Sequence, residues 1–292
     1  MHNIDSINHV TGKSVYLDDI PQQEDTLFSL VVDSPIAHGR IKKLDFQAAL
    51  KLQGVINVFT ARDIPGNNQL GIIIPDEPLF AEEELHYIGQ PIALIIAETG
   101  LIARKAKKLI IIEFEELPII IDEREAFVKQ QFIIPPSTFK IGNTSKTFAE
   151  CDYVIEGEVK SGAQEHLYIE TQGAYAIPVE NNCLKVYSST QGPTSVQKIT
   201  AGVLGISMHK IEVDVRRLGG GFGGKEDQAT ALAAMASLAA YLLKKPVKLI
   251  YHRLDDMRMT GKRHPYTSDF RIGLSKELKI IAYEVNFMQN LI

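Results

Sequence analysis

The segment 184–251 constrains the fold most, because strand-like and helix-like patterns alternate along it. The stretches "LKVYSST", "IEVDVRRL" and "VKLIY" are typical of strands, and the second of them alternates apolar with polar residues. Thr194 stands three residues before Gln197 in a capping-box pattern, which predicts a helix that runs to Gly205. The alanine-rich "DQATALAAMASLAAYLLKK" predicts a second helix that ends before Pro246. The predicted order is therefore β-α-β-α-β.

This order brings two turns together. Gln191 follows the first strand, and the glycine-rich "GGGFGGKE" at 219–226 follows the second. If these strands are parallel and the connections right-handed, both turns lie at the carboxyl ends of strands. We therefore expect an amide from one turn and backbone N–H groups from the other to converge on an anionic or oxo-bearing ligand.

The glycine-rich loop fits two phosphate-binding templates incompletely. Gly219, Gly224 and Lys225 match the P-loop, but Glu226 stands where a Ser or Thr would bind magnesium. With Gly221, the same glycines match the dinucleotide fingerprint, whose acidic partner about 20 residues later would fall inside the alanine-rich helix. Binding of ATP or NAD thus remains an alternative hypothesis.

A purely structural interpretation of the loop is also open. The glycines could serve only to pack a helix tightly on its strand, with Glu226 and Asp227 placed to interact with the helix dipole. Phe222, the one bulky residue among the glycines, fits either the wall of a cavity or a packing position in the core.

The first part of the chain predicts a separate mixed domain. Apolar runs such as "LFSLVV" and "PIALIIAET" are typical of strands, and "FQAALKLQG" and "TGLIARKAKKL" have helical spacing. The stretch "VKQQFIIPPSTFKIGNTSK" has two adjacent prolines and little periodicity, which indicates a linker. We therefore expect a first domain at 1–135, a linker at 136–146 and a second domain at 147–292.

Composition limits the partners and the location. With 292 residues, 45% hydrophobic residues and a net charge of −5, the chain is typical of soluble globular proteins and has no basic excess for nucleic acid. Cys151 and Cys183 are the two cysteines, and their spacing supports neither a disulfide framework nor a cysteine-held metal site. The sequence shows neither a signal core nor a membrane span, so we expect no membrane partner and a cytoplasmic protein.

Six stretches, which together span almost the whole chain, resemble the molybdenum hydroxylase family of xanthine dehydrogenase and its aldehyde oxidase relatives. They are "HVTGKSVYLDDI", "GQPIALIIAET", "QEHLYIET", "SSTQGPTSVQ", "GGGFGGKE" and "MTGKRHPY", and they occur in the family's order. The resemblance implies an α+β fold, with a mixed α/β hammerhead domain followed by a β-α-β-α-β molybdopterin-binding half-domain.

The resemblance also implies roles for the residues of the two turns. Gln191 matches the amide that hydrogen-bonds the oxo ligand of molybdenum. Phe222 and Gly223 match the loop that approaches the metal, and Gly221 and Gly224 flank them as further cofactor-binding positions. The metal itself is expected to be held through the pterin, with no direct protein ligand.

Glu226 matches the carboxylate that holds the heterocycle in purine-hydroxylating members, where aldehyde oxidases are usually apolar. Such a carboxylate, buried against a heterocycle, would favour a purine-like substrate over an aldehyde. In "QEHLYIET", His166 is interpreted as a structural histidine, because no second ligand stands at metal-binding spacing.

The family continues beyond the point where this chain stops, at Ile292. The missing half would supply the general base, and iron–sulfur and FAD modules would be partner subunits. We therefore predict the molybdenum-binding subunit, or a fragment of it, of a xanthine dehydrogenase-like enzyme that oxidises purines or related N-heterocycles with oxygen from water. A further chain would carry the missing half if the subunit is split. The alternatives are a catalytically silent assembly fragment and a nucleotide-binding protein that uses the glycine-rich loop.

Overall fold

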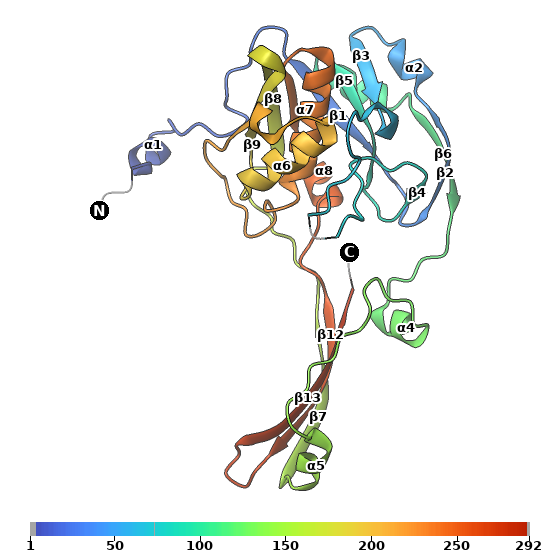
Figure 1. Cartoon of the computed structure of the whole chain (residues 1–292), viewed down its shortest axis with the longest axis vertical. Helices are drawn as coiled ribbons and strands as arrows, with labels where there is room; N and C mark the ends of the chain where they lie inside the picture. The colour runs from blue at the N-terminus through green and yellow to red at the C-terminus, as the bar shows by residue number, and fades with distance from the viewer. Residues whose placement is uncertain (1–3, 73, 291–292) are drawn as a thin grey trace. The chain divides into compact units, whose positions relative to one another are not determined.

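The computed structural model describes residues 4–72 and 74–290. These residues form two compact units, each built from two segments of the chain (Figure 1). The first unit comprises Met1–Pro118 and His166–Gly261, and the second comprises Ile119–Glu165 and Lys262–Ile292. No helix among the described residues is long and apolar enough to cross a membrane.

A seven-stranded sheet, as far as the described residues show, organises the first unit in the order β10-β9-β8-β11-β1-β5-β3. Neighbouring strands pair in parallel only at β9/β10 and β1/β11. The strands are β1 (Leu27–Asp33), β3 (Val55–Phe59), β5 (Pro91–Ala97), β8 (Gly173–Val179), β9 (Cys183–Ser188), β10 (Ile211–Asp214) and β11 (Val247–Ile250). The fold is therefore mixed α/β, as the sequence predicts.

The predicted order β-α-β-α-β is confirmed along the chain, and a further strand enters the sheet between two of these strands. The strands predicted as a consecutive β-α-β-α-β set are β9, β10 and β11, and β9 and β10 are parallel neighbours. However, β8 lies between β9 and β11 and is antiparallel to both. β8 precedes β9 in the chain and pairs with it as an antiparallel hairpin, which places β8 between β9 and β11.

Two helices cover one face of this sheet and form its main core. They are α6 (Pro193–Leu204) and α7 (Ala229–Leu243), which pack on each other and which Figure 1 shows lying over β8 and β9. Nearly every residue of α7 up to Ala240 is buried, because its alanines let the helix approach β8 closely. The predicted capping box is wrong: Gly192 is the N-cap, and Gln197 instead donates to the Ile211 carbonyl at 2.6 Å. The predicted end at Gly205 is confirmed by its left-handed φ of 65°.

The other end of the first unit carries a smaller sheet in the order β4-β2-β6, which is formed by β2 (Gly39–Asp45), β4 (Glu84–Leu85) and β6 (Ile111–Glu116). The shorter helices of the first unit are α1 (Ser6–Val10), α2 (Gln47–Leu50), α3 (Gly100–Lys107) and α8 (Arg253–Met259). Thr99 caps α3 by accepting from the Ile102 N–H at 3.2 Å.

The second unit is an antiparallel sheet with two short helices. Its strands, in the order β13-β12-β7, are β7 (Tyr153–Ser161), β12 (Tyr266–Leu274) and β13 (Ile280–Gln289), and its helices are α4 (Glu123–Val128) and α5 (Thr144–Ala149). Arg124 joins helix to sheet through Asp269 and Glu158. Few of its side chains are buried, so most of its order comes from strand pairing.

We expect Ala236→Leu in α7 to lower the free energy of unfolding by about 1–3 kcal/mol, because added methyl groups at a fully buried, close-packed position force strain. Urea unfolding followed by circular dichroism measures this. Leu242→Ala, at a half-exposed position of the same helix, is the control and should cost less. Equal losses for the two variants would contradict close packing of the alanine face.

Candidate functional site

The turn after β9 and the glycine-rich loop after β10 lie against each other. The backbone N–H groups of Gly223 and Lys225 donate to Gln191 Oε1 at 3.1 and 3.3 Å. In return, the Gln191 N–H donates to the Lys225 carbonyl at 2.8 Å. The two turns therefore meet, as the parallel pairing of β9 and β10 predicts.

These contacts orient the exposed Gln191 amide. Because Oε1 accepts from the loop, the amide NH₂ group is directed elsewhere as a donor, and no described residue accepts from it. Gly221 is required for this approach, since a Cβ at that position would lie 2.4 Å from Gln191 Oε1. The site thus presents a pre-oriented amide donor to any ligand at this surface.

Phe222 lies at the outer side of the loop. Its ring is 77% exposed, so it is not a packing residue of the core. Its φ of 55° is unusual for a bulky side chain, and Gly223 beside it has a φ of 91°. A non-glycine residue with a positive φ has a strained backbone, and such residues cluster at ligand-binding sites.

Glu226 is also exposed and lies next to the Gln191 turn. A Cβ built on Gly192 would be 3.0 Å from the Glu226 carbonyl, so the two segments are adjacent. Among the described residues Glu226 faces solvent, and its burial against a bound heterocycle stays a prediction. For the helix-dipole interpretation, α7 begins at Ala229 with Gln228 as its N-cap, so Glu226 and Asp227 lie just before the helix and outside its first turn.

Lys225 points the other way, into the protein, and its side chain is fully buried. Its Nζ donates to the Glu170 carbonyl at 2.7 Å and to Glu170 Oε2 at 3.1 Å, and it lies 4.5 Å from the centre of the Tyr168 ring. A P-loop lysine must reach the phosphates, and this one is engaged below the loop. The P-loop match is therefore a coincidence of spacing.

A buried hydrogen-bond network continues from this lysine and was not foreseen from the sequence. Tyr168 Oη donates to Asp256 Oδ1 at 2.9 Å, and the Gln172 N–H donates to Asp256 Oδ2 at 3.1 Å. Gln172 Nε2 donates both to Tyr168 Oη and to the Gly224 carbonyl, at 2.8 and 2.9 Å. Segment 168–172 and α8 thus support the glycine-rich loop on its buried side. Of the two acidic residues in "RLDDMRM", Asp256 is buried and Asp255 is not. The one sequence signal for this difference is the face of the helix on which each residue falls.

Burial dominates the electrostatics of this network. It lowers the pKa of the Lys225 ammonium, and the neighbouring Glu170 carboxylate opposes that shift. It raises the pKa of Asp256, against the hydrogen bonds from Tyr168 and Gln172. The pKa of the Tyr168 phenol is also raised by burial, so this hydroxyl stays a donor at neutral pH.

His166 packs under the same loop. Its ring stacks on Tyr168 with centroids 6.3 Å apart, and a Cβ on Gly224 would lie 2.6 Å from its Cγ. The ring therefore has a packing role beneath the glycines, which agrees with its interpretation as a structural residue.

We expect Lys225→Met to lower the free energy of unfolding by about 2–4 kcal/mol, because it leaves the largely buried Glu170 carboxylate without its cation. Urea denaturation measures the loss. Lys198→Met on the exposed side of α6 should stay within about 0.5 kcal/mol of the unchanged chain. If the two variants unfold alike, the ion pair does not support the loop.

Comparison with known protein families gives two matches. Residues 126–291 match the family described as molybdopterin cofactor-binding domain. Residues 11–118 match the aldehyde oxidase and xanthine dehydrogenase a/b hammerhead domain.

Similar curated proteins are much longer than this chain. Xanthine dehydrogenase of Dictyostelium discoideum is 43% identical over 94% of the chain, and xanthine dehydrogenase 1 of Arabidopsis thaliana is 40% identical over 96% of it. Aldehyde oxidase 2 of Cavia porcellus is 36% identical over 98%. The chain covers only 20–21% of the length of these relatives.

Solved structures share the fold. The aldehyde oxidoreductase from Desulfovibrio gigas superposes with a TM-score of 0.88 at 27% identity, over 98% of this chain and 34% of that one. The quinoline 2-oxidoreductase from Pseudomonas putida 86 superposes with a TM-score of 0.83 at 24% identity, over 98% of this chain and 38% of that one, which shows the fold alone.

Proposed function

Since the chain belongs to the family of molybdopterin cofactor-binding proteins that includes aldehyde oxidases and xanthine dehydrogenases, we propose that it forms part of the molybdenum site of a hydroxylase. The substrates proposed are purines or related N-heterocycles, and water is the source of the oxygen. The observation that carries the proposal is the Gln191 amide, whose oxygen is held by the glycine-rich loop and whose NH₂ group is presented outward.

The loop fits the molybdenum cofactor on two counts. The Gln191 Nε2 has no acceptor among the described residues and is oriented for an oxygen ligand. The backbone at Gly221, Phe222, Gly223 and Gly224 brings little side-chain bulk apart from one exposed ring, so a planar group can approach the main chain. When bound, the cofactor supplies the two-electron oxidation chemistry.

The residues of this chain would bind and orient. Gln191 would donate a hydrogen bond to an oxygen atom of the bound cofactor, and the fixed amide would need no reorientation when charge develops there. Phe222 would offer an apolar face beside the reacting position and would exclude water from it. These two proposed roles rest on the exposed positions of the Gln191 and Phe222 side chains.

Glu226 is proposed to bind the substrate. Its carboxylate is exposed and lies next to the Gln191 turn, so it is accessible to a ligand there. A purine presents N–H donors that an ionised carboxylate accepts, and an aldehyde does not. Contact with a ligand and with the other parts of the enzyme would bury this carboxylate and make it selective.

The remaining chemistry would come from outside these residues. Cys151 and Cys183 are both free thiols, and an iron–sulfur cluster needs about four cysteine ligands. We therefore propose that iron–sulfur clusters, FAD and the general base are carried by other segments or subunits of a cytoplasmic assembly. Within this chain we propose the hammerhead domain at 1–135 and the cofactor-binding half-domain at 147–292, joined by 136–146.

The first test is the molybdenum and pterin content of the chain purified from a host that makes the cofactor. We expect molybdenum and pterin in near-equal amounts. Gly221→Val would displace the Gln191 amide, and less than about one-tenth of the molybdenum should then be retained. Thermal unfolding with ATP or NAD is the comparison, and neither should raise the midpoint. Absence of molybdenum together with stabilisation by a nucleotide would replace the proposal with the nucleotide-binding alternative.

The second test addresses the substrate in the assembled enzyme. Glu226→Gln should lower kcat/KM for xanthine by about 10–100-fold, since a charge-assisted hydrogen bond to the substrate is weakened. Turnover of an aromatic aldehyde should change by less than a factor of about 3 under the same conditions. An equal loss for both substrates would place Glu226 outside the substrate contact.

A further inference from the structure

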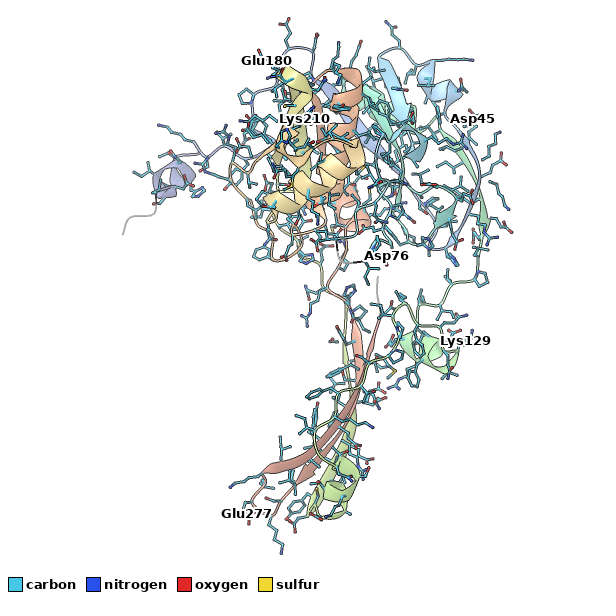
Figure 2. The ribbon with its side chains drawn as sticks, in the orientation of Figure 1. Asp45, Asp76, Lys129, Glu180, Lys210 and Glu277 are labelled. Carbon is cyan, nitrogen blue, oxygen red and sulfur yellow. The ribbon has the colours of Figure 1, made fainter. Side chains whose placement is uncertain are left out.

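Three side chains on the small sheet form a cluster that the molybdenum site does not use. They are His38, Glu84 and His86, and one ligand atom from each lies within 4.8 Å of the others. Among the described residues this is the only set of three or more histidine, cysteine or acidic residues with such spacing. His38 directly precedes β2, Glu84 lies in β4 and His86 directly follows β4, whereas the candidate site is built after β9 and β10. In Figure 2, the label Asp45 marks the last residue of β2.

Strand register brings the three residues together. β2 and β4 pair antiparallel with Gly39 opposite Leu85, so the next position along the ladder sets His38 opposite His86. Glu84 and His86 flank the fully buried Leu85, and they therefore share the opposite, outer face of β4. The two imidazole rings are 6.2 Å apart and nearly parallel.

His38 is held as metal-binding histidines are. Its Nδ1 lies 2.7 Å from the Pro118 carbonyl, which can only accept, so Nδ1 carries a proton. This leaves Nε2 facing Glu84 Oε1 at 3.1 Å. A histidine that binds a metal through one nitrogen typically donates from the other to a carbonyl or carboxylate, which fixes the ring.

The spacing of one ligand pair suits a tetrahedral ion. Bonds of about 2.0 Å at tetrahedral angles separate two ligand atoms by roughly 3.3 Å, and His38 Nε2 and Glu84 Oε1 already lie 3.1 Å apart. His86 has an exposed ring, while its backbone is fixed by donation to the buried Gln90 Oε1 at 2.7 Å. Rotation of one solvent-exposed ring therefore completes the set.

We propose that His38, Glu84 and His86 bind one Zn²⁺ ion, with water as the fourth ligand. Two imidazoles and a carboxylate are a ligand set that zinc accepts, whereas calcium and magnesium prefer oxygen ligands alone. The nearest competing cation is Arg40, whose Nε is 3.8 Å from Glu84 Oε2, and that pair is exposed and weak. The other carboxylate oxygen, Oε1, remains directed at His38 Nε2.

The ion would fasten the weakest strand of this sheet. β4 has only two residues and pairs with β2 at two positions, so it is held by few backbone hydrogen bonds. Zinc would join Glu84 and His86 of this segment to the start of β2, and His38 would link it through Pro118 to the end of β6. The site is structural and does not depend on the proposed molybdenum chemistry.

The test is zinc binding by the tag-free, chelator-treated 292-residue chain. Isothermal titration with ZnCl₂ should give one ion per chain, and CoCl₂ should give the intense visible absorption of a tetrahedral site. His86→Ala and Glu84→Gln should each weaken zinc binding at least about 10-fold. His209→Ala, at an exposed histidine outside the cluster, is the control and should bind as the unchanged chain does.

Zinc should also raise the thermal midpoint of the unchanged chain and of the His209→Ala variant, but not that of the His86→Ala variant. Because His86 is exposed, we expect the His86→Ala variant to fold normally. Its circular dichroism spectrum without zinc should match that of the unchanged chain. Substoichiometric binding, or binding that survives both His86→Ala and Glu84→Gln, would overturn the proposal.

Discussion

The buried ion pair between Lys225 and Glu170 is the interaction on which the candidate site depends. Glu170 Oε2 accepts from Lys225 at one end of the glycine-rich loop and from the Gly219 N–H, at 2.8 Å, at the other. Its second oxygen accepts from the Leu17 N–H at 3.3 Å. One carboxylate thus fixes both ends of the loop, and the cost of removing its charge from water is offset by three donors.

From this anchor the geometry of the outer face follows. With the Lys225 side chain held inward, its backbone N–H is turned toward Gln191 Oε1. Gln172 and His166 support the loop from below at Gly224, where a larger residue would collide with the histidine ring. The buried side chains set the shape, and the exposed Gln191, Phe222 and Glu226 remain available for ligands. This arrangement is pre-organised, because the loop is held by the buried side chains and by Gln191 Oε1, while the Gln191 NH₂ group, the Phe222 ring and the Glu226 carboxylate remain exposed.

The sequence predicts those parts of the structure that depend on neighbours in the chain. The alanine-rich α7, the end of α6 at Gly205 and the parallel pair β9/β10 all follow from local patterns. The predicted capping box is wrong because the Gln197 side chain donates to a distant acceptor, the Ile211 carbonyl. Residue spacing along the chain does not reveal such a distant partner. The insertion of β8 between β9 and β11 likewise depends on pairing between remote segments.

The candidate site shows the same division. The residues of its outer face could be picked out from the glycine pattern and from the family resemblance. Their support could not, because Glu170 meets the loop only in three dimensions, and Asp256 supports it only through Gln172. The side to which Lys225 points was equally hidden, since a motif gives the spacing of residues along the chain and not the face of the backbone that a side chain takes. An identical G-x-x-x-x-G-K spacing can therefore cradle a phosphate when the lysine lies above the loop, or bury an ion pair when it lies below. The partner that decides between these outcomes is Glu170, 55 residues earlier.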